Sequence, residues 1–126
     1  MALQSFIIGR IKSFSYAYKG AFLLLTTEHS AIVQGLAAVV VTTLGFVFNI
    51  SAVEWMLQTL AIGLVLGMEG LNTAVEKTAD FIHPEYDDKI GRIKDIAAGA
   101  VFCSAVCAFA IGCIIYVPRF IELLDL

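Results

Sequence analysis

The sequence predicts an all-α membrane protein in which an N-terminal amphipathic surface helix precedes a bundle of three transmembrane helices. Of the 126 residues, 60% are hydrophobic, and the mean hydropathy is +0.88. A soluble domain is roughly 45–50% apolar. The apolar residues gather in three long runs with few or no charges, whereas all basic side chains lie outside these runs. Both features are typical of a chain that crosses a bilayer.

Residues 1–28 are expected to form the surface helix. Apolar side chains recur every three or four residues and make one helix face, while basic side chains occupy another. The apolar set is Ile7, Ile11, Phe14, Tyr18, Ala21 and Leu25, and the opposing set is Lys12, Tyr16 and Lys19. This pattern is typical of a helix that lies in the membrane interface. Glu28, His29 and Ser30 are expected to end the helix.

The expected transmembrane spans are residues 31–48, 52–71 and 96–117, with residues 72–95 forming helix ends and a loop between the last two. The first span contains 18 residues, with Gln34 as its strongly polar side chain. At about 1.5 Å per residue it just crosses a hydrocarbon core of roughly 30 Å. We expect the whole chain, residues 1–126, to form one domain.

Local signals predict where the later helices begin and end. Ser51 is a candidate N-cap for the second span, with Trp55 as its interface anchor. Pro84 is expected to end that helix, since the residue before a proline is disfavoured in the α region. Asp87 or Asp88 can cap the third helix, and Pro118 is expected to end it.

The distribution of positive charge predicts the topology. Seven of the eight basic residues lie before the first span or between the second and third: Arg10, Lys12, Lys19, Lys77, Lys89, Arg92 and Lys94. Because basic loops stay on the cytoplasmic side, we expect the N-terminus inside and the C-terminus outside.

A polar stripe runs along the second transmembrane helix and out of it. Glu69, Asn72, Glu76 and Asp80 are three or four residues apart and so share one helix face. An ionisable group at membrane depth is costly and is usually functional. Glu76 and Asp80 are also a like-charge pair four residues apart, which is unfavourable unless a cation binds between them.

The side chains expected on the cytoplasmic side have the chemistry of metal-assisted phosphoryl transfer. They comprise Glu28, Glu69, Asn72, Glu76, Asp80, Glu85, Asp87, Lys94 and Asp95, with Lys12 and Tyr16 on the surface helix. Carboxylates hold magnesium, lysines neutralise phosphate, and a deeper carboxylate can accept a proton from a hydroxyl. The chain has no Walker A motif and no kinase glycine-rich loop, so a nucleotide site would be of another kind. The chain also lacks the runs of basic residues that would indicate nucleic-acid binding.

Two other classes of function remain open from the residues alone. A small ion-coupled transporter would use Glu69 as its proton carrier and would move protons without ATP. A non-catalytic helical assembly factor would bind no ATP. Individual residues also have structural alternatives: Asn72 could bond a neighbouring helix, Lys94 could extend to the interface, and Lys12 and Tyr16 could contact lipid headgroups.

Two segments resemble the prokaryotic diacylglycerol kinase family, which includes the undecaprenol kinases. They are E-G-L-N-T-A-V-E-K-T-A-D (residues 69–80) and I-K-D-I-A-A-G-A-V (residues 93–101). The resemblance covers nearly the whole chain. It implies a small homotrimeric enzyme of the bacterial inner membrane, with active sites shared between subunits and with ATP and Mg²⁺ as co-reactants.

The resemblance also implies a role for each site residue. Glu69 looks like the general base, and Glu28 and Glu76 look like the metal ligands. The implied ATP-binding residues are Lys12, Tyr16, Glu28, Glu76, Glu85, Tyr86, Asp87, Lys94 and Asp95. The implied lipid-binding residues are Ser13, Gln34, Trp55, Glu69, Asn72 and Ala98. The lipid could be diacylglycerol or undecaprenol, and the segments Glu54–Trp55 and Gly112–Arg119 look more like the undecaprenol-kinase branch.

Overall fold

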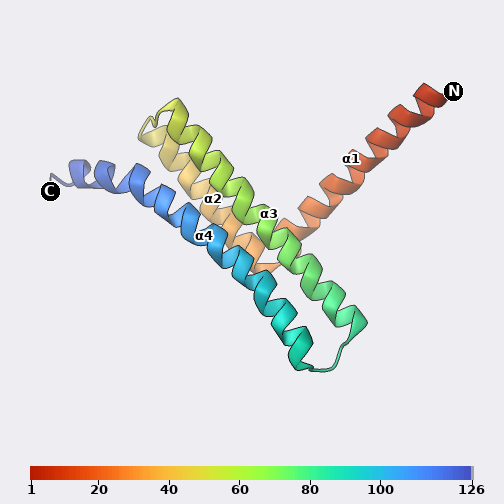
Figure 1. The fold of residues 1–126 in the computed structure, drawn as a ribbon. Helices are drawn as coiled ribbons and strands as arrows, with labels where there is room; N and C mark the ends of the chain where they lie inside the picture. The colour runs from red at the N-terminus through yellow and green to blue at the C-terminus, as the bar shows by residue number, and fades with distance from the viewer. Residues whose placement is uncertain (126) are drawn as a thin grey trace.

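The computed structural model describes residues 1–125, which form four α-helices: α1 (Ala2–Thr27), α2 (His29–Val47), α3 (Ala52–Ile82) and α4 (Asp88–Leu123). Helices α2, α3 and α4 lie side by side in an elongated bundle, and α1 leaves the bundle at a steep angle (Figure 1). The described residues contain no strand. The prediction of an all-α membrane protein is confirmed, because α2, α3 and α4 are long and apolar enough to cross a bilayer.

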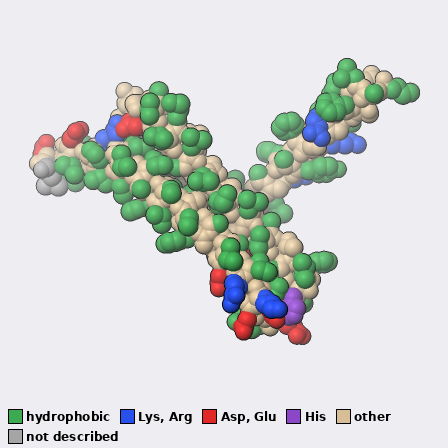
Figure 2. Space-filling view, in the orientation of Figure 1, with side chains coloured by type: hydrophobic (Ala, Val, Ile, Leu, Met, Phe, Trp, Pro, Cys, Tyr) green, Lys and Arg blue, Asp and Glu red, His purple; other side chains and the backbone are tan. Residues whose placement is uncertain are grey.

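The surface of the bundle is apolar in its middle and charged at its ends. Figure 2 shows hydrophobic side chains over the length of the three helices, with acidic and basic side chains gathered at the α3–α4 loop and at the opposite end. Many large apolar residues are exposed, among them Leu60 at 71% and Phe109 at 75%. Contiguous apolar surface of this extent requires a nonpolar surrounding, which the hydrocarbon of a membrane provides.

The break between α1 and α2 is a single residue. Glu28 has an extended backbone (φ −93°, ψ 116°) and serves both as the C-cap of α1 and as the N-cap of α2. Its N–H donates to Leu24 O and its carbonyl accepts from Ile32 N, at 3.2 and 2.9 Å. The predicted break at residues 28–30 is therefore correct only for Glu28, since His29 and Ser30 already belong to α2.

The turn between α2 and α3 is held by local chemistry. Asn49 has a positive φ of 48°, a conformation that asparagine tolerates better than most residues. Ser51 caps α3 as predicted: its hydroxyl accepts from Glu54 N, and the Glu54 side chain accepts from Ser51 N in return. This reciprocal pair is a capping box, which satisfies two backbone donors at once.

The loop between α3 and α4 also follows the sequence signals. Helix α3 ends at Ile82, two residues before Pro84. Asp87 is the N-cap of α4, because its Oδ1 accepts hydrogen bonds from Lys89 N at 2.8 Å and Ile90 N at 3.4 Å. Of the two predicted caps, Asp87 and Asp88, the structure selects the first.

The prediction that the third transmembrane helix ends at Pro118 was wrong. Helix α4 continues through Pro118 to Leu123, and its last turns bend away from the earlier axis (Figure 1). Proline lacks the N–H that would bond the carbonyl four residues earlier, so it weakens and kinks a helix. Here the next residue stabilises this part of the helix. Arg119 donates to Ile115 O and forms a bidentate ion pair with Glu54 at 2.8 and 2.9 Å.

The best-packed part of the bundle lies at the α2–α3 turn. Ile50, Ile115 and Tyr116 are buried there and pack against Phe48 and Trp55, among others. The Tyr116 hydroxyl lies within hydrogen-bond distance of Val41 O (2.8 Å) and Gln58 Oε1 (2.5 Å). These contacts join α2, α3 and α4 at the end of the bundle that is remote from the α3–α4 loop.

Candidate active site

The polar stripe of α3 passes from the buried interior of the bundle to its charged end. Glu69, Asn72 and Thr73 are 6%, 9% and 9% exposed, Glu76 is half-buried, and Asp80 is exposed. Burial of an ionisable side chain is unfavourable unless it is hydrogen-bonded or paired. The contacts of Glu69 and its neighbours therefore indicate what the stripe can do.

Glu69 has a partner on α2. Gln34 Nε2 donates a 2.8 Å hydrogen bond to Glu69 Oε2, so the polar side chain of the first span meets the deepest carboxylate of the second. The other amide atom, Gln34 Oε1, is buried and has no partner among the described residues. The pair thus holds the carboxylate in place and leaves an acceptor free for a hydroxyl donor.

One helical turn further along α3, Asn72 Nδ2 donates to Glu76 Oε1 at 3.2 Å. Asn72 Oδ1 is buried and lacks a partner in the part of the chain that the structure describes. Buried acceptors are rarely left without a donor or cation. An amide oxygen beside a carboxylate is the kind of donor set that magnesium accepts. The arrangement fits the metal-ligand role predicted for Glu76 and adds Asn72, which the sequence had assigned to lipid binding.

Glu28, the other predicted metal ligand, contacts a lysine. Its Oε1 lies 2.9 Å from Lys77 Nζ on α3, and the hydrogen bond from Lys77 to Glu28 raises the pKa of the lysine. Among residues 1–125, no three His, Cys, Asp or Glu side chains lie close enough together to hold a metal ion. A metal ion held by Glu28 and Glu76 would therefore need further donors of another kind, such as an amide oxygen, water or phosphate.

The residues expected to bind ATP at the α3–α4 loop lie together at the charged end. Lys94 Nζ contacts Asp80 Oδ1 at 2.5 Å, which fastens the start of α4 to the end of α3. Tyr86 and Asp95 are exposed, and the Tyr86 hydroxyl donates to Asp88 Oδ1 at 3.0 Å. Glu85 is exposed, and its carbonyl lies 2.7 Å from His83 Nδ1. The Asp87 carboxylate is engaged in capping α4.

The residues predicted on the surface helix are not brought to this cluster. Lys12, Ser13 and Tyr16 are exposed on the part of α1 that projects from the bundle (Figure 1). Ser13 Oγ bonds only within its own helix, to Gly9 O at 3.0 Å. One copy of the chain therefore leaves these three side chains apart from Glu69 and Glu76.

Two further predicted lipid-binding residues are also separate. Trp55 lies in the packed end of the bundle, with its ring 4.8 Å from that of Phe46. It is 14 residues from Glu69, about 21 Å along α3. Ala98 is exposed on α4. Of the predicted lipid-binding set, the chain by itself gathers Gln34, Glu69 and Asn72.

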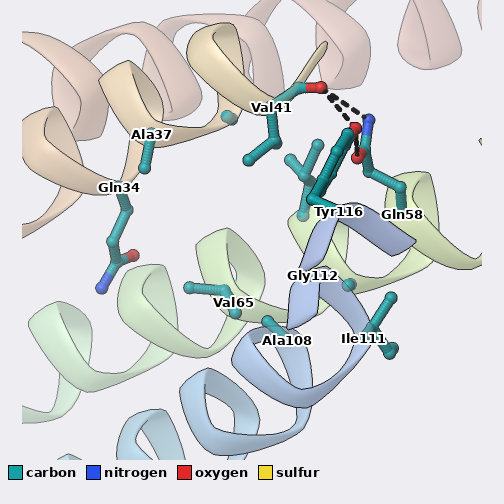
Figure 3. Close-up of a pocket in the computed structure, with 12 residues that line it drawn as sticks. Gln34, Ala37, Val41, Gln58, Val65, Ala108, Ile111, Gly112 and Tyr116 are labelled. Atoms are coloured by element: carbon teal, nitrogen blue, oxygen red, sulfur yellow. Dashed lines mark hydrogen bonds between the residues drawn. The ribbon is translucent and has the colours of Figure 1, made fainter. Parts of the chain in front are cut away.

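An apolar cavity of about 160 Å³ lies between α2, α3 and α4. Its walls are mostly small or branched apolar side chains, such as Ala37, Ala108 and Val65 (Figure 3). Gln34 marks one end, and the bonded group of Tyr116, Gln58 and Val41 closes the other (Figure 3). The cavity thus connects the Gln34–Glu69 pair with the packed end of the bundle.

Sequence reasoning missed several of these contacts. In the sequence analysis, Lys77 served only as a positive charge that predicts membrane orientation. Its position next to Glu76 could have indicated that it contacts a carboxylate of the site. Gln58 was not predicted to form contacts, although it lies in an uncharged run, where a buried amide needs hydrogen-bond partners. Glu54 stands three residues after Ser51, the spacing of a capping box.

A family model described as prokaryotic diacylglycerol kinase matches residues 15–116. The chain belongs to the prokaryotic diacylglycerol kinase family. Membership confirms the resemblance found in the two sequence segments and makes the protein a membrane lipid kinase, with ATP as the co-substrate. The alternative of an ion-coupled transporter finds no support.

Three relatives in this kinase family illustrate the similarity. Undecaprenol kinase of Bacillus subtilis is 38% identical over 108 residues, covering 86% of this chain and 88% of the relative. Diacylglycerol kinase of Escherichia coli K12 is 28% identical over 110 residues, covering 87% and 90%. Diacylglycerol kinase of Synechocystis is 29% identical over 113 residues, covering 89% and 65%.

Proposed function

We propose that this lipid kinase is an undecaprenol kinase, which transfers the γ-phosphoryl group of ATP to the terminal hydroxyl of undecaprenol. The observation that carries the proposal is the Gln34–Glu69 pair at one end of a small apolar cavity. The undecaprenol kinase of B. subtilis is 38% identical, whereas the diacylglycerol kinases compared are 28–29% identical.

The volume of the cavity favours a lipid with one chain. At about 160 Å³, it is smaller than the roughly 300–1,000 Å³ of a site that encloses a drug-sized ligand. It can receive a segment of one chain. Undecaprenol has a single chain that ends in a primary hydroxyl, whereas diacylglycerol has two chains.

Glu69 is the proposed general base. The lipid hydroxyl would approach the end of the cavity where Gln34 fixes one carboxylate oxygen, and Glu69 would accept the hydroxyl proton as the phosphoryl group transfers in line. Gln34 Oε1, which has no partner among the described residues, can accept a hydrogen bond during approach. Catalysis of this kind depends mainly on positioning and charge neutralisation.

Glu76 and Glu28 are the proposed magnesium ligands, with Asn72 Oδ1 as a further oxygen donor. Magnesium supplies charge neutralisation on the phosphate oxygens when it is bound. The chain's own part is to present oxygen ligands at the charged end of the bundle. The fit rests on the Asn72–Glu76 contact and on the buried, unpartnered Asn72 oxygen.

ATP would bind at the α3–α4 loop. Lys94 and Asp95, together with Glu85 and Tyr86, supply charged and polar groups there, while Asp87 holds the start of α4. The positive charges of the loop and of α1 favour a cytoplasmic location for this end, where ATP is available. Asn72 and Ala98 would contribute to lipid binding, and Trp55 would contact the far part of the lipid.

In this proposal, the α1 residues reach an active site only on a second copy of the chain. These residues are Lys12, Ser13 and Tyr16. They project away from the bundle on α1, so a homotrimer would let α1 of one subunit reach the site of another. Co-expression of Lys12→Ala and Glu69→Gln subunits tests this arrangement. Partial recovery of activity in mixed trimers is expected, and no recovery would contradict shared sites.

The lipid assignment is tested by one assay. Purified protein in mixed micelles receives labelled ATP and magnesium, with undecaprenol and diacylglycerol offered in parallel. We expect a higher kcat/KM for undecaprenol. A higher value for diacylglycerol would make the protein a diacylglycerol kinase, and labelling of neither lipid would contradict the proposed reaction.

A further inference from the structure

Lys77 stands at the point where the metal site is proposed. Its Nζ lies 2.9 Å from Glu28 Oε1, which links α3 to the break between α1 and α2. Glu76 and Asp80 also interact favourably with its charge. The lysine therefore contacts one proposed metal ligand, Glu28, and lies in the field of two more carboxylates, of which Glu76 is the other proposed ligand.

The surroundings of this ion pair are open. Lys77 and Glu28 both line a groove of about 390 Å³ between α1 and α3, whose walls are otherwise mostly apolar. The Lys77 side chain is 67% exposed and that of Glu28 is 28% exposed. A flexible, exposed ammonium can leave such a contact without disturbing the packing of α3, because its four-carbon stem has several rotatable bonds.

We propose that Lys77 occupies the cation position beside Glu28 in the metal-free protein and that a divalent cation must displace it. Lys77 thereby weakens divalent-cation binding and prevents Glu28 from remaining an unpaired carboxylate when no metal ion is bound. The inference rests on the proposed function, because that function makes Glu28 a metal ligand.

The physical reason is the conflict between two cations at one carboxylate. A carboxylate oxygen that accepts from an ammonium at 2.9 Å cannot also bind a metal ion without bringing two positive charges within a few ångströms, where they repel. Solvent screens much of this repulsion because the pair is exposed. We therefore expect a moderate effect on metal affinity, about three- to tenfold.

The test measures metal binding directly. Protein in lipid nanodiscs without ATP is titrated with Mn²⁺, and free Mn²⁺ is followed by electron paramagnetic resonance. Lys77→Met should bind Mn²⁺ about three- to tenfold more tightly than the wild type. Lys89→Met is the matched control, because it removes the same charge from an exposed side chain at the start of α4. It should change the affinity less than about twofold.

The same titration in Glu28→Gln protein separates competition at Glu28 from the effect of a change in net charge. In Glu28→Gln protein, Lys77→Met should lose most of its effect, because the carboxylate for which lysine and metal compete is gone. A full effect in that background would overturn the proposal. So would equal affinities for Lys77→Met and Lys89→Met, or weaker binding by Lys77→Met. Lys77→Gln, checked by gel filtration, serves if the methionine variant does not fold.

The outcomes also distinguish this inference from the proposed function. If the wild type phosphorylates undecaprenol but Lys77→Met binds Mn²⁺ no more tightly than Lys89→Met, only the role of Lys77 fails. If no variant binds Mn²⁺ and neither lipid is phosphorylated, the metal-assisted reaction itself fails, and the inference fails with it.

Discussion

Gln34 on α2 and Glu69 on α3 are joined by a 2.8 Å hydrogen bond at the boundary between the apolar bundle and its charged end. The carboxylate is almost fully buried, and the amide that fixes it lies 35 positions earlier in the chain. The pair connects the apolar cavity with the stripe of polar side chains. Its two members can therefore be tested separately for chemistry and for positioning.

Replacement of the proposed base should abolish most turnover. Glu69→Gln keeps the size of the side chain and removes its ability to accept a proton, so we expect kcat to fall by about 10²–10⁴. ATP binding and the elution volume of the protein should not change. The measurement is phosphorylation of undecaprenol in mixed micelles, and near-normal kcat would show that another group is the base.

Loss of the positioning amide should reduce activity less than loss of the base. Gln34→Leu leaves Glu69 buried without its donor, which costs about 1–3 kcal/mol of stability, and we expect a fall in kcat of about tenfold. Thr43→Val, a polar-to-apolar change at an exposed site on the same helix, is the control. Equal kcat values for the two variants would contradict a positioning role for Gln34.

Removal of a proposed metal ligand should raise the magnesium requirement. Glu76→Gln retains a side-chain oxygen but loses the negative charge, so the magnesium concentration for half-maximal activity should rise by about tenfold or more. Glu122→Gln makes the same change near the C-terminal end of α4, far from the proposed site, and should leave the magnesium titration unaltered. A Glu76→Gln curve that overlies the wild-type curve would exclude the ligand role.

The hydroxyl of Tyr116 should stabilise the bundle. Tyr116→Phe leaves Gln58 Oε1 and Val41 O without this donor, and we expect a loss of about 1 kcal/mol in the free energy of unfolding. Unfolding in mixed micelles measures the loss. Because Tyr116 and Gln58 bond each other, the Tyr116→Phe, Gln58→Leu double variant should lose less than the sum of the single losses. Strict additivity would mean that the pair contributes nothing.

The last turn of α2 should not tolerate a methyl group at Gly45. A Cβ there would lie 2.6 Å from Trp55 Cη2, and such overpacking costs about 1–3 kcal/mol. Gly63→Ala is the matched control, because a Cβ at Gly63 meets no atom of the described chain within 4 Å. The same unfolding assay should show a large loss for the first variant only. Trp55→Phe should partly rescue Gly45→Ala by making room.

The sequence predicted most of the fold because its signals are local. Hydropathy runs reveal membrane spans without knowledge of packing, and capping residues such as Ser51 and Asp87 act within one helical turn. Pro118 was misread because the contact that maintains the helix beyond it comes from Glu54, 65 positions away. A local breaking signal was overridden by a tertiary contact, which no local pattern contains.

For the candidate site too, local features could be predicted from the sequence and long-range contacts could not. The sequence by itself determined the stripe from Glu69 to Asp80, since helical periodicity puts residues three and four apart on one face, and its motifs identified the kinase family. Only the tertiary structure decided the partners of these side chains: Gln34 for Glu69, Lys77 for Glu28 and Lys94 for Asp80. Such pairs depend on how α2, α3 and α4 pack, and packing is set by the shapes of many side chains together rather than by the spacing of a few.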